Sequence, residues 1–149
     1  MATVFLDSSA VVRRYARSEP GAAQVRALCE PAHGNTILVA RITSVEVASA
    51  LSRKAREGEV SSLELNRLWR VFRGHWRRQY QVMPLGADIY RRAEQLLFAH
   101  ALRAYDAVQI GCVLIAVEQY PDLPLEFWTA DQRQAQIAAA EGLPVRLVN

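Results

Sequence analysis

Four acidic residues occupy positions from which they can act together on one ligand. Asp7 directly follows an apolar run, Asp131 lies two residues after another, and Glu46 lies one loop and one helical turn beyond a third. Asp106 begins a strongly apolar helical segment, where burying a lone carboxylate is costly. Four carboxylates in one pocket repel one another and are expected to stay ionised only around cations. Their oxygens favour Mg²⁺ or Mn²⁺, and such sites are suited to phosphodiester hydrolysis.

Each acid also has an ordinary structural interpretation. Asp7 and Asp131 can be helix N-caps, a position where aspartate is common. Asp106 can complement the dipole of its helix from the first turn, and Glu46 can be an exposed helix residue. Taken one at a time, these interpretations stay open, whereas the four acids together favour a function.

Strands and helices alternate along the chain and would position these acids. The alternation predicts an α/β fold with a mostly parallel sheet. The predicted strands are continuous apolar runs, as expected when both faces of a sheet are covered. Ligands bind beyond the carboxyl ends of parallel strands, so Asp7, Glu46 and Asp131 are expected at one edge, and Asp106 joins them if its helix starts there. The five strands are predicted at 3–6, 36–40, 82–85, 125–129 and 145–148.

Cap residues and apolar stripes predict the helices. Ser61 and Glu64 form a capping box at the start of the longest helix. Its stripe includes Trp69, Phe72 and Trp76, a spacing more typical of a core or a dimer surface than of a base-stacking platform. The helices are predicted at 10–17, 22–29, 44–56, 61–80, 87–102, 105–118 and 131–141.

Length and composition are those of one soluble domain covering residues 1–149. The net charge of +3 permits an anionic partner without requiring one. Cys29 and Cys112 lie in predicted helices and are expected to be buried free thiols. The residues before Asp7 carry no basic targeting segment, and no apolar stretch is long enough to span a membrane, so a cytoplasmic location without membrane contact is expected.

Basic residues recur on the longest predicted helix. Arg70, Arg73 and Arg77 can track RNA phosphates beside the site or form a solvated helix face, and the sequence does not separate the two. The histidines lack metal-ligand spacing and are expected at the surface: His33, His75 and His100.

The segments around the four acids resemble the PIN domain, particularly its VapC-type toxins. The matching segments appear in the family's order and span nearly the whole chain. They are VFLDSS at 4–9, TSVEVASAL at 43–51, LRAYDA at 102–107, WTAD at 128–131 and AAAEG at 138–142.

The resemblance implies a PIN-like three-layer α/β/α sandwich with a mostly parallel sheet of about five strands. It implies endonucleolytic cleavage of RNA by the toxin of a type II toxin–antitoxin pair. It also implies a homodimer and a cognate antitoxin, which we expect to pack on the helix pair 44–56 and 61–80. Two sets of residues would form the pocket: Asp7, Glu46, Asp106 and Asp131 as ligands of one or two Mg²⁺ or Mn²⁺ ions, and Ser8, Ser9 and Thr129 as hydroxyl groups that orient carboxylates or water.

Other α/β classes are less well supported. The sequence contains no GxGxxG, GxxxxGK[ST] or GxSxG motif, so dinucleotide, P-loop and nucleophile-elbow sites lack support. A receiver-type module would need a second acid near Asp7 and a late lysine, whereas Lys54 is the only lysine. The alternative that stays open is a non-catalytic PIN-like module that binds RNA or protein.

Overall fold

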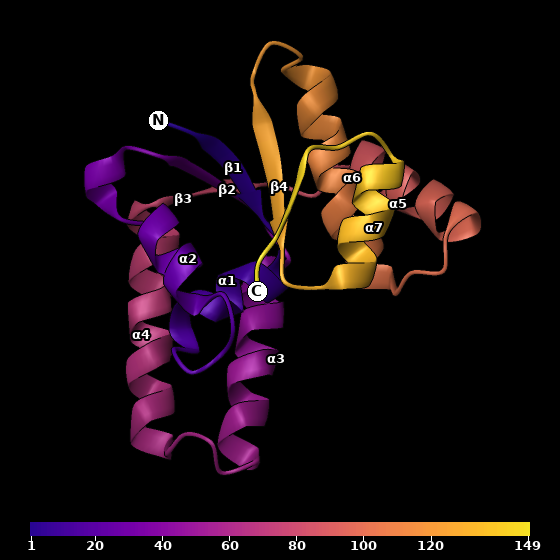
Figure 1. The fold of residues 1–149 in the computed structure, drawn as a ribbon. Helices are drawn as coiled ribbons and strands as arrows, with labels where there is room; N and C mark the ends of the chain where they lie inside the picture. The colour runs from indigo at the N-terminus through magenta and orange to yellow at the C-terminus, as the bar shows by residue number, and fades with distance from the viewer.

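A computed structural model describes all 149 residues and contains a five-stranded sheet between two layers of helices (Figure 1). Every strand pairing is parallel, so the predicted α/β class is confirmed and the sheet is wholly parallel. The strand order is β3-β2-β1-β4-β5. The strands are β1 (Thr3–Leu6), β2 (Thr36–Ala40), β3 (Tyr80–Met83), β4 (Leu125–Thr129) and β5 (Val145–Leu147).

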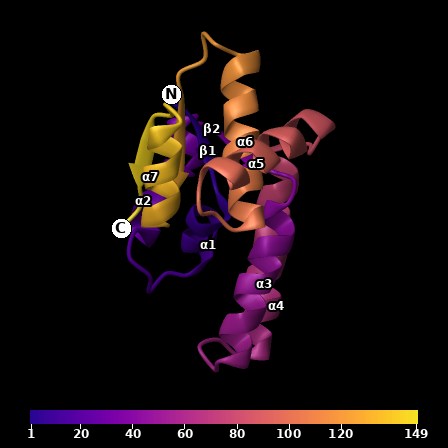
Figure 2. The same cartoon turned by 90° about the vertical axis from the view of Figure 1, so that its right-hand side faces the viewer.

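Seven α-helices and one 3-10 turn (η1, Pro31–His33) connect the strands. Helices α3 and α4 form an antiparallel pair that projects away from the sheet in both views (Figures 1 and 2). None of the helices is both long and apolar enough to cross a bilayer. The helices are α1 (Ser8–Tyr15), α2 (Ala22–Leu28), α3 (Thr43–Arg56), α4 (Ser62–Arg78), α5 (Ala87–Ala99), α6 (Ala104–Gln119) and α7 (Gln132–Ala140).

The alternation of side chains along the strands fills two separate cores. On β1, Val4 and Leu6 belong to the core formed with α1 to α4, whereas Phe5 belongs to the core formed with α5 to α7. Helix α6 is buried without interruption from Ala107 to Ala116. A helix apolar on all sides is typical of a protein interior, and this burial fixes the position of Asp106 immediately before it.

The aromatic stripe of α4 is part of the first core, as predicted. Phe72 is completely buried, and Trp69 and Trp76 pack against the same cluster. Cys29 and Cys112 are buried free thiols, which confirms that prediction too.

Strand β3 and helix α5 differ from their predicted bounds. Strand β3 begins at Tyr80 rather than two residues later, because the Tyr80 phenol is buried and lies 2.7 Å from the Tyr15 phenol. Arg14 also donates to the Tyr80 hydroxyl, at 2.9 Å. Helix α5 ends at Ala99, three residues earlier than predicted.

The prediction that all histidines lie at the surface is wrong for His75. This residue is half-buried, with Nδ1 2.7 Å from the Tyr15 hydroxyl and Nε2 3.3 Å from the Arg14 guanidinium. Burial, together with Arg14 and Arg78, lowers the pKa of His75 to about 4, so the ring is neutral at pH 7.

Candidate active site

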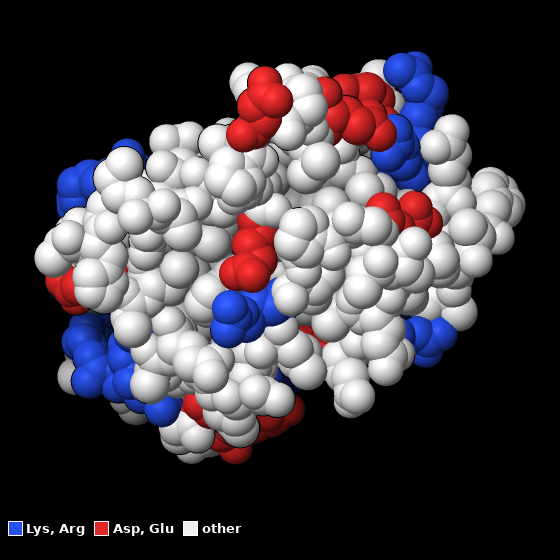
Figure 3. All heavy atoms as spheres, turned by 45° about the horizontal axis from the view of Figure 1, so that its top comes forward, with Lys and Arg blue, Asp and Glu red and all other residues white.

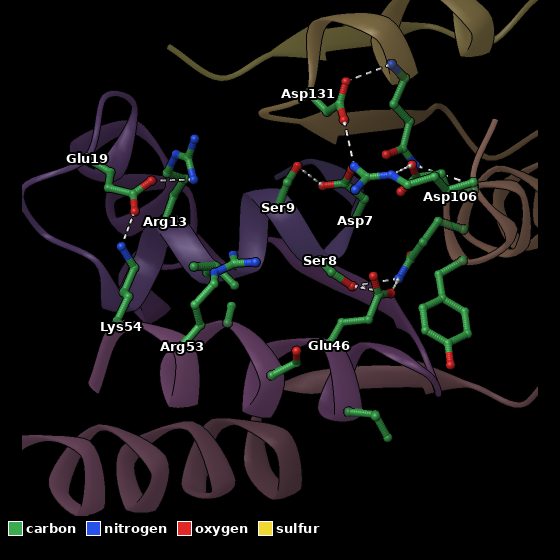
Figure 4. A pocket seen from close by; sticks show the side chains of 18 of the residues that line it. Asp7, Ser8, Ser9, Arg13, Glu19, Glu46, Arg53, Lys54, Asp106 and Asp131 are labelled. Atoms are coloured by element: carbon green, nitrogen blue, oxygen red, sulfur yellow. Dashed lines mark hydrogen bonds and ion pairs between the residues drawn. The ribbon is translucent and has the colours of Figure 1, made fainter. Parts of the chain in front are cut away.

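The four predicted acids line one cavity of about 700 Å³ at the edge where the parallel strands end (Figure 4). Asp7 follows β1, Asp131 follows β4, and Glu46 lies in the first turn of α3 after β2. Asp106 joins them because α6 also starts at this edge. The structure thus brings together carboxylates from four separate parts of the chain.

Asp7 is a buried carboxylate without a cationic partner. Its Oδ1 accepts hydrogen bonds from the Ser9 hydroxyl at 2.7 Å and the Ala10 amide at 2.9 Å, and its Oδ2 accepts one from Thr129 at 2.5 Å. The bond from Ala10 makes Asp7 the N-cap of α1, as its ordinary interpretation allowed. Burial nevertheless raises the pKa of Asp7 to about 7, and Asp106 adds to the rise.

Asp106 and Asp131 face the same arginine. The Arg103 guanidinium lies 3.4 Å from Asp106 Oδ2 and 3.9 Å from Asp131 Oδ2, while its side chain is 84% exposed. Burial raises the pKa of Asp106 and the charges of Asp131 and Glu46 add to it, although Arg103 opposes the rise. Asp131 is also the N-cap of α7, because its Oδ1 accepts from the amides of Arg133 and Gln134.

Glu46 is held by one of its two oxygens. Its Oε1 accepts from the Ser8 hydroxyl at 2.7 Å and from Gln109 Nε2 at 2.9 Å, whereas Oε2 makes no hydrogen bond. Gln109 is 1% exposed, and its Nε2 also lies 2.8 Å from Ser8 Oγ and 3.0 Å from Thr43 Oγ1. This polar cluster fixes the glutamate at the start of α3.

Gln109 is the site residue that the sequence analysis missed. It lies three residues after Asp106, so both occupy one face of α6. That spacing is the signal that points to it. Its own Oε1 is buried without a partner, a costly arrangement for a group whose only evident task is to hold Glu46.

The three predicted hydroxyl residues all contact the acids. Ser8 binds Glu46, and Ser9 and Thr129 bind Asp7. The hydroxyls of Ser9 and Thr129 also lie 3.2 Å apart, so the oxygens of Asp7 are fixed from two sides.

Basic side chains line the cavity, but they are not the predicted ones. Arg70, Arg73 and Arg77 are exposed on α4 and take no part in the cavity lining. This exposure agrees with the solvated helix face that the sequence analysis left open, and α3, which packs against α1, lies between α4 and the cavity. Binding of RNA by these arginines stays a prediction. The basic residues that do line the cavity are Arg13, Arg53, Lys54 and Arg103.

The donor atoms of the cavity fit a hard divalent cation. No three acidic, histidine or cysteine side chains stand close enough together to enclose a metal ion. However, the donors are all carboxylate and hydroxyl oxygens, the set that Mg²⁺ and Mn²⁺ prefer. The uncompensated Asp7 and the free Oε2 of Glu46 supply the negative charge that such an ion requires.

Comparison with known proteins identifies the family. The PIN domain model matches residues 4–140. The chain belongs to the PIN domain family. Two relatives from Mycobacterium tuberculosis, Ribonuclease VapC45 and Ribonuclease VapC49, are each 31% identical to it over 145 residues, which cover 97% of this chain and 95% of theirs.

Solved structures share the PIN fold of this chain. VapBC2 from Rickettsia felis, bound to a promoter DNA fragment, has a TM-score of 0.64 at 10% identity and covers 99% of both chains. The Mycobacterium tuberculosis toxin VapC20, which cleaves the sarcin–ricin loop, has a TM-score of 0.61 at 16% identity, with 94% and 95% covered. These structures confirm the predicted fold, and the two ribonuclease relatives confirm the resemblance to VapC-type proteins.

Proposed function

We propose that this protein is a single-domain, Mg²⁺- or Mn²⁺-dependent endoribonuclease and the toxin of a type II toxin–antitoxin pair. The observation that carries the proposal is the buried Asp7 carboxylate without a cation, in a cavity that it shares with the three other predicted acids. The relatives with 31% identity over almost the whole chain are ribonucleases, which supports the same activity.

Asp7 and Asp106 would be the principal ligands of the cation, and Asp131 would bind it partly through water. Glu46 would be either a further ligand or, as the geometry of its Oε2 favours, the acceptor of a proton from water. When bound, the cation would offset the carboxylate charges, polarise the phosphodiester and lower the pKa of a water molecule. The three hydrogen bonds on Asp7 hold its oxygens in place before any ligand arrives. Preorganisation of this kind limits the cost of binding.

Glu46 would accept the proton of the attacking water. Ser8 and Gln109 occupy its Oε1, which leaves Oε2 free for that proton. A general base must be oriented as well as basic, and the buried Gln109 provides the orientation.

Arg53 would bind a phosphate of the RNA next to the cleaved one. It lines the cavity on α3, two helical turns from Glu46, and hence about 10 Å along the helix. Arg13 and Lys54 nearby are paired with Glu19, whereas Arg53 has no ion-pair partner. A free guanidinium at this distance suits the backbone of a bound strand.

A cognate antitoxin and a second copy of this chain would bind the α3–α4 pair. This pair projects from the sheet and exposes Val45 and Leu63, at 61% and 80%. Structures of VapBC2 and of a Klebsiella pneumoniae toxin–antitoxin complex share the fold. An RNA target and a DNA-binding antitoxin would place the pair in the cytoplasm.

RNA cleavage by the purified, antitoxin-free protein tests the proposed activity. We expect cleavage with Mg²⁺ or Mn²⁺, none with EDTA, and a loss of roughly 100- to 1,000-fold in Asp106→Asn. The matched control is Asp122→Asn, because Asp122 is exposed in a loop outside the cavity and its change should leave cleavage unaltered. A folded protein that binds RNA without cutting any would instead establish the non-catalytic alternative.

A further inference from the structure

A second cavity, of about 240 Å³, lies between the end of α1, the end of α2 and helix α4. It shares no residue with the acidic cavity. In Figure 3, basic side chains gather on the left-hand side of the molecule, which is the side of α2 and α4 in Figure 1. Glu30 is the only acid in the lining, which contains four arginines: Arg14, Arg17, Arg26 and Arg67.

Most of the arginine charge in this cavity is not neutralised. Arg14 is held by Tyr80 and His75, and both partners are neutral at pH 7 because burial raises the pKa of Tyr80 to about 12 and lowers that of His75 to about 4. Arg17 takes part in no ion pair, and Arg67 alone has an acidic partner, Glu64 at 2.7 Å. Glu30 therefore faces an excess of positive charge.

Arg26 shows that the lining is incomplete as a hydrogen-bond network. Its Nη1 is buried and has no acceptor within hydrogen-bond distance. A buried donor without an acceptor destabilises the folded protein, and buried polar groups are nearly always paired. Arg26 also lines the cavity, so an anion bound there would lie beside this guanidinium and offset its charge.

We propose that this cavity binds a phosphate group through Arg14, Arg17 and Arg26. Guanidinium groups bind phosphate through two parallel N–H donors. Several guanidiniums can share one phosphate because it offers three or four oxygens in a tetrahedral array, whereas a carboxylate offers two. The phosphate belongs either to a free anion, such as inorganic phosphate or a nucleotide, or to the RNA backbone, and the second source rests on the proposed function.

Calorimetric titration with inorganic phosphate at constant ionic strength tests the site without any cleavage assay. We expect saturable binding to the wild type and to Arg91→Gln, and at least about tenfold weaker binding to Arg26→Gln. Arg91 is the matched control because it is exposed on α5, in the other helix layer. No saturable binding to the wild type, or equal binding to all three proteins, would overturn the proposal.

A second variant protects the test against loss of folding. If Arg26→Gln is unfolded at the temperature of the titration, Arg17→Gln replaces it. Arg17 is exposed and takes part in no ion pair, so its substitution should leave the fold intact. The same tenfold weakening is expected.

RNA binding distinguishes the two sources of the phosphate. The assay uses a labelled RNA oligonucleotide and the Asp106→Asn background in the presence of EDTA, so that no cleavage is expected. Weaker RNA binding on adding Arg26→Gln, but not Arg91→Gln, identifies an RNA-backbone site, whereas unchanged RNA binding identifies a site for a free phosphate or nucleotide. A competition experiment with an oligoglutamate peptide tests for a carboxylate site instead. If the peptide binds the cavity more tightly than phosphate does, the proposal is overturned.

Discussion

The two cavities both border helix α1 and carry opposite charge. Ser8, Ser9 and Arg13 of α1 line the acidic cavity, and Arg14 and Arg17 line the arginine cavity. The positive end of the helix dipole thus meets the carboxylates and the negative end meets the guanidiniums. The helix dipole therefore reduces the repulsion within each group of like charges. Neither group is fully neutralised by other residues of the protein.

The cavities differ in how firmly their charged groups are fixed. Asp7 is buried and its two oxygens accept three hydrogen bonds, whereas Arg17 is exposed and makes no ion pair. The acidic cavity is therefore built to hold a ligand in one geometry, as a reaction requires. The arginine cavity can attract an anion without holding it in a single orientation.

The largest expected effect concerns cleavage by Asp7→Asn. We expect a loss of roughly 100- to 1,000-fold with the fold intact, because asparagine keeps the cap of α1 but removes the charge. Cleavage of a labelled RNA with Mn²⁺ measures it. Full activity in this variant would show that Asp7 is not needed for cleavage and that the acidic cavity is not the catalytic one.

The same substitution should stabilise the metal-free protein above neutral pH. The rise in the Asp7 pKa from 3.8 to about 7 means that the folded state binds this proton more tightly than the unfolded state. The stabilising contribution of the protonated group is complete below pH 3.8 and is lost as the pH rises to about 7. Above pH 7, the ionised Asp7 therefore lowers the free energy of unfolding by about 4 kcal/mol relative to its value below pH 3.8.

Urea unfolding at several pH values measures this contribution. The free energy of unfolding of Asp7→Asn, relative to that of the wild type, should increase from pH 4 to pH 8 in the presence of EDTA. Saturating Mn²⁺ should reduce the increase, because a bound cation stabilises the wild type. A relative free energy that does not vary with pH would contradict a buried, uncompensated Asp7.

Gln109→Met should lower activity by about 10- to 100-fold, the usual effect of losing a residue that orients a metal ligand. It should also lower the free energy of unfolding by about 1–3 kcal/mol, since Ser8 and Glu46 lose a buried donor. The decrease in activity should appear in kcat rather than in KM. Gln95→Met on the exposed face of α5 is the control, and equal activity of the two variants would count against positioning by Gln109.

The smallest expected effect concerns Arg103→Gln. Removing this exposed cation from Asp106 and Asp131 should tighten Mn²⁺ binding by about two- to fivefold, the range of an exposed ion pair. Calorimetry with Mn²⁺ measures it, with Arg146→Gln near Glu126 as the control. Weaker binding in Arg103→Gln would show that the arginine organises the acids rather than competing with the cation.

Much of the fold could be predicted because the buried strands are continuous apolar runs. The bounds of β1, β2 and β4 agree with the prediction. Strand β3 was misplaced because its buried Tyr80 stands between two glutamines and is fixed by polar contacts with Arg14, 66 residues away. The pattern of neighbouring residues does not reveal contacts between residues so far apart in the sequence.

The acids could be predicted from one topological rule, the shared edge of parallel strands, and Ser8, Ser9 and Thr129 from the family resemblance, whereas Gln109 and Arg53 could not. Gln109 lies in an otherwise apolar helix, and its spacing of three residues from Asp106 points to the site only once Asp106 is known to belong to it. The position of Arg53 depends on which face of α3 borders the cavity, and the position of Arg70 outside the cavity lining depends on α3 packing between α4 and α1. These positions follow from helix packing, which helical spacing alone does not determine.

The order in which the site is assembled has a consequence for synthesis of the protein. The central strand β1 pairs with β4, so this pairing cannot form until the fourth strand has been synthesised. Asp131 and helix α7 come later still, close to the carboxyl end of the chain. Because long-range pairing of this kind forms late, a nascent chain lacks the complete acidic cavity until β4 and Asp131 have been synthesised. A shorter chain therefore cannot bring all four carboxylates together.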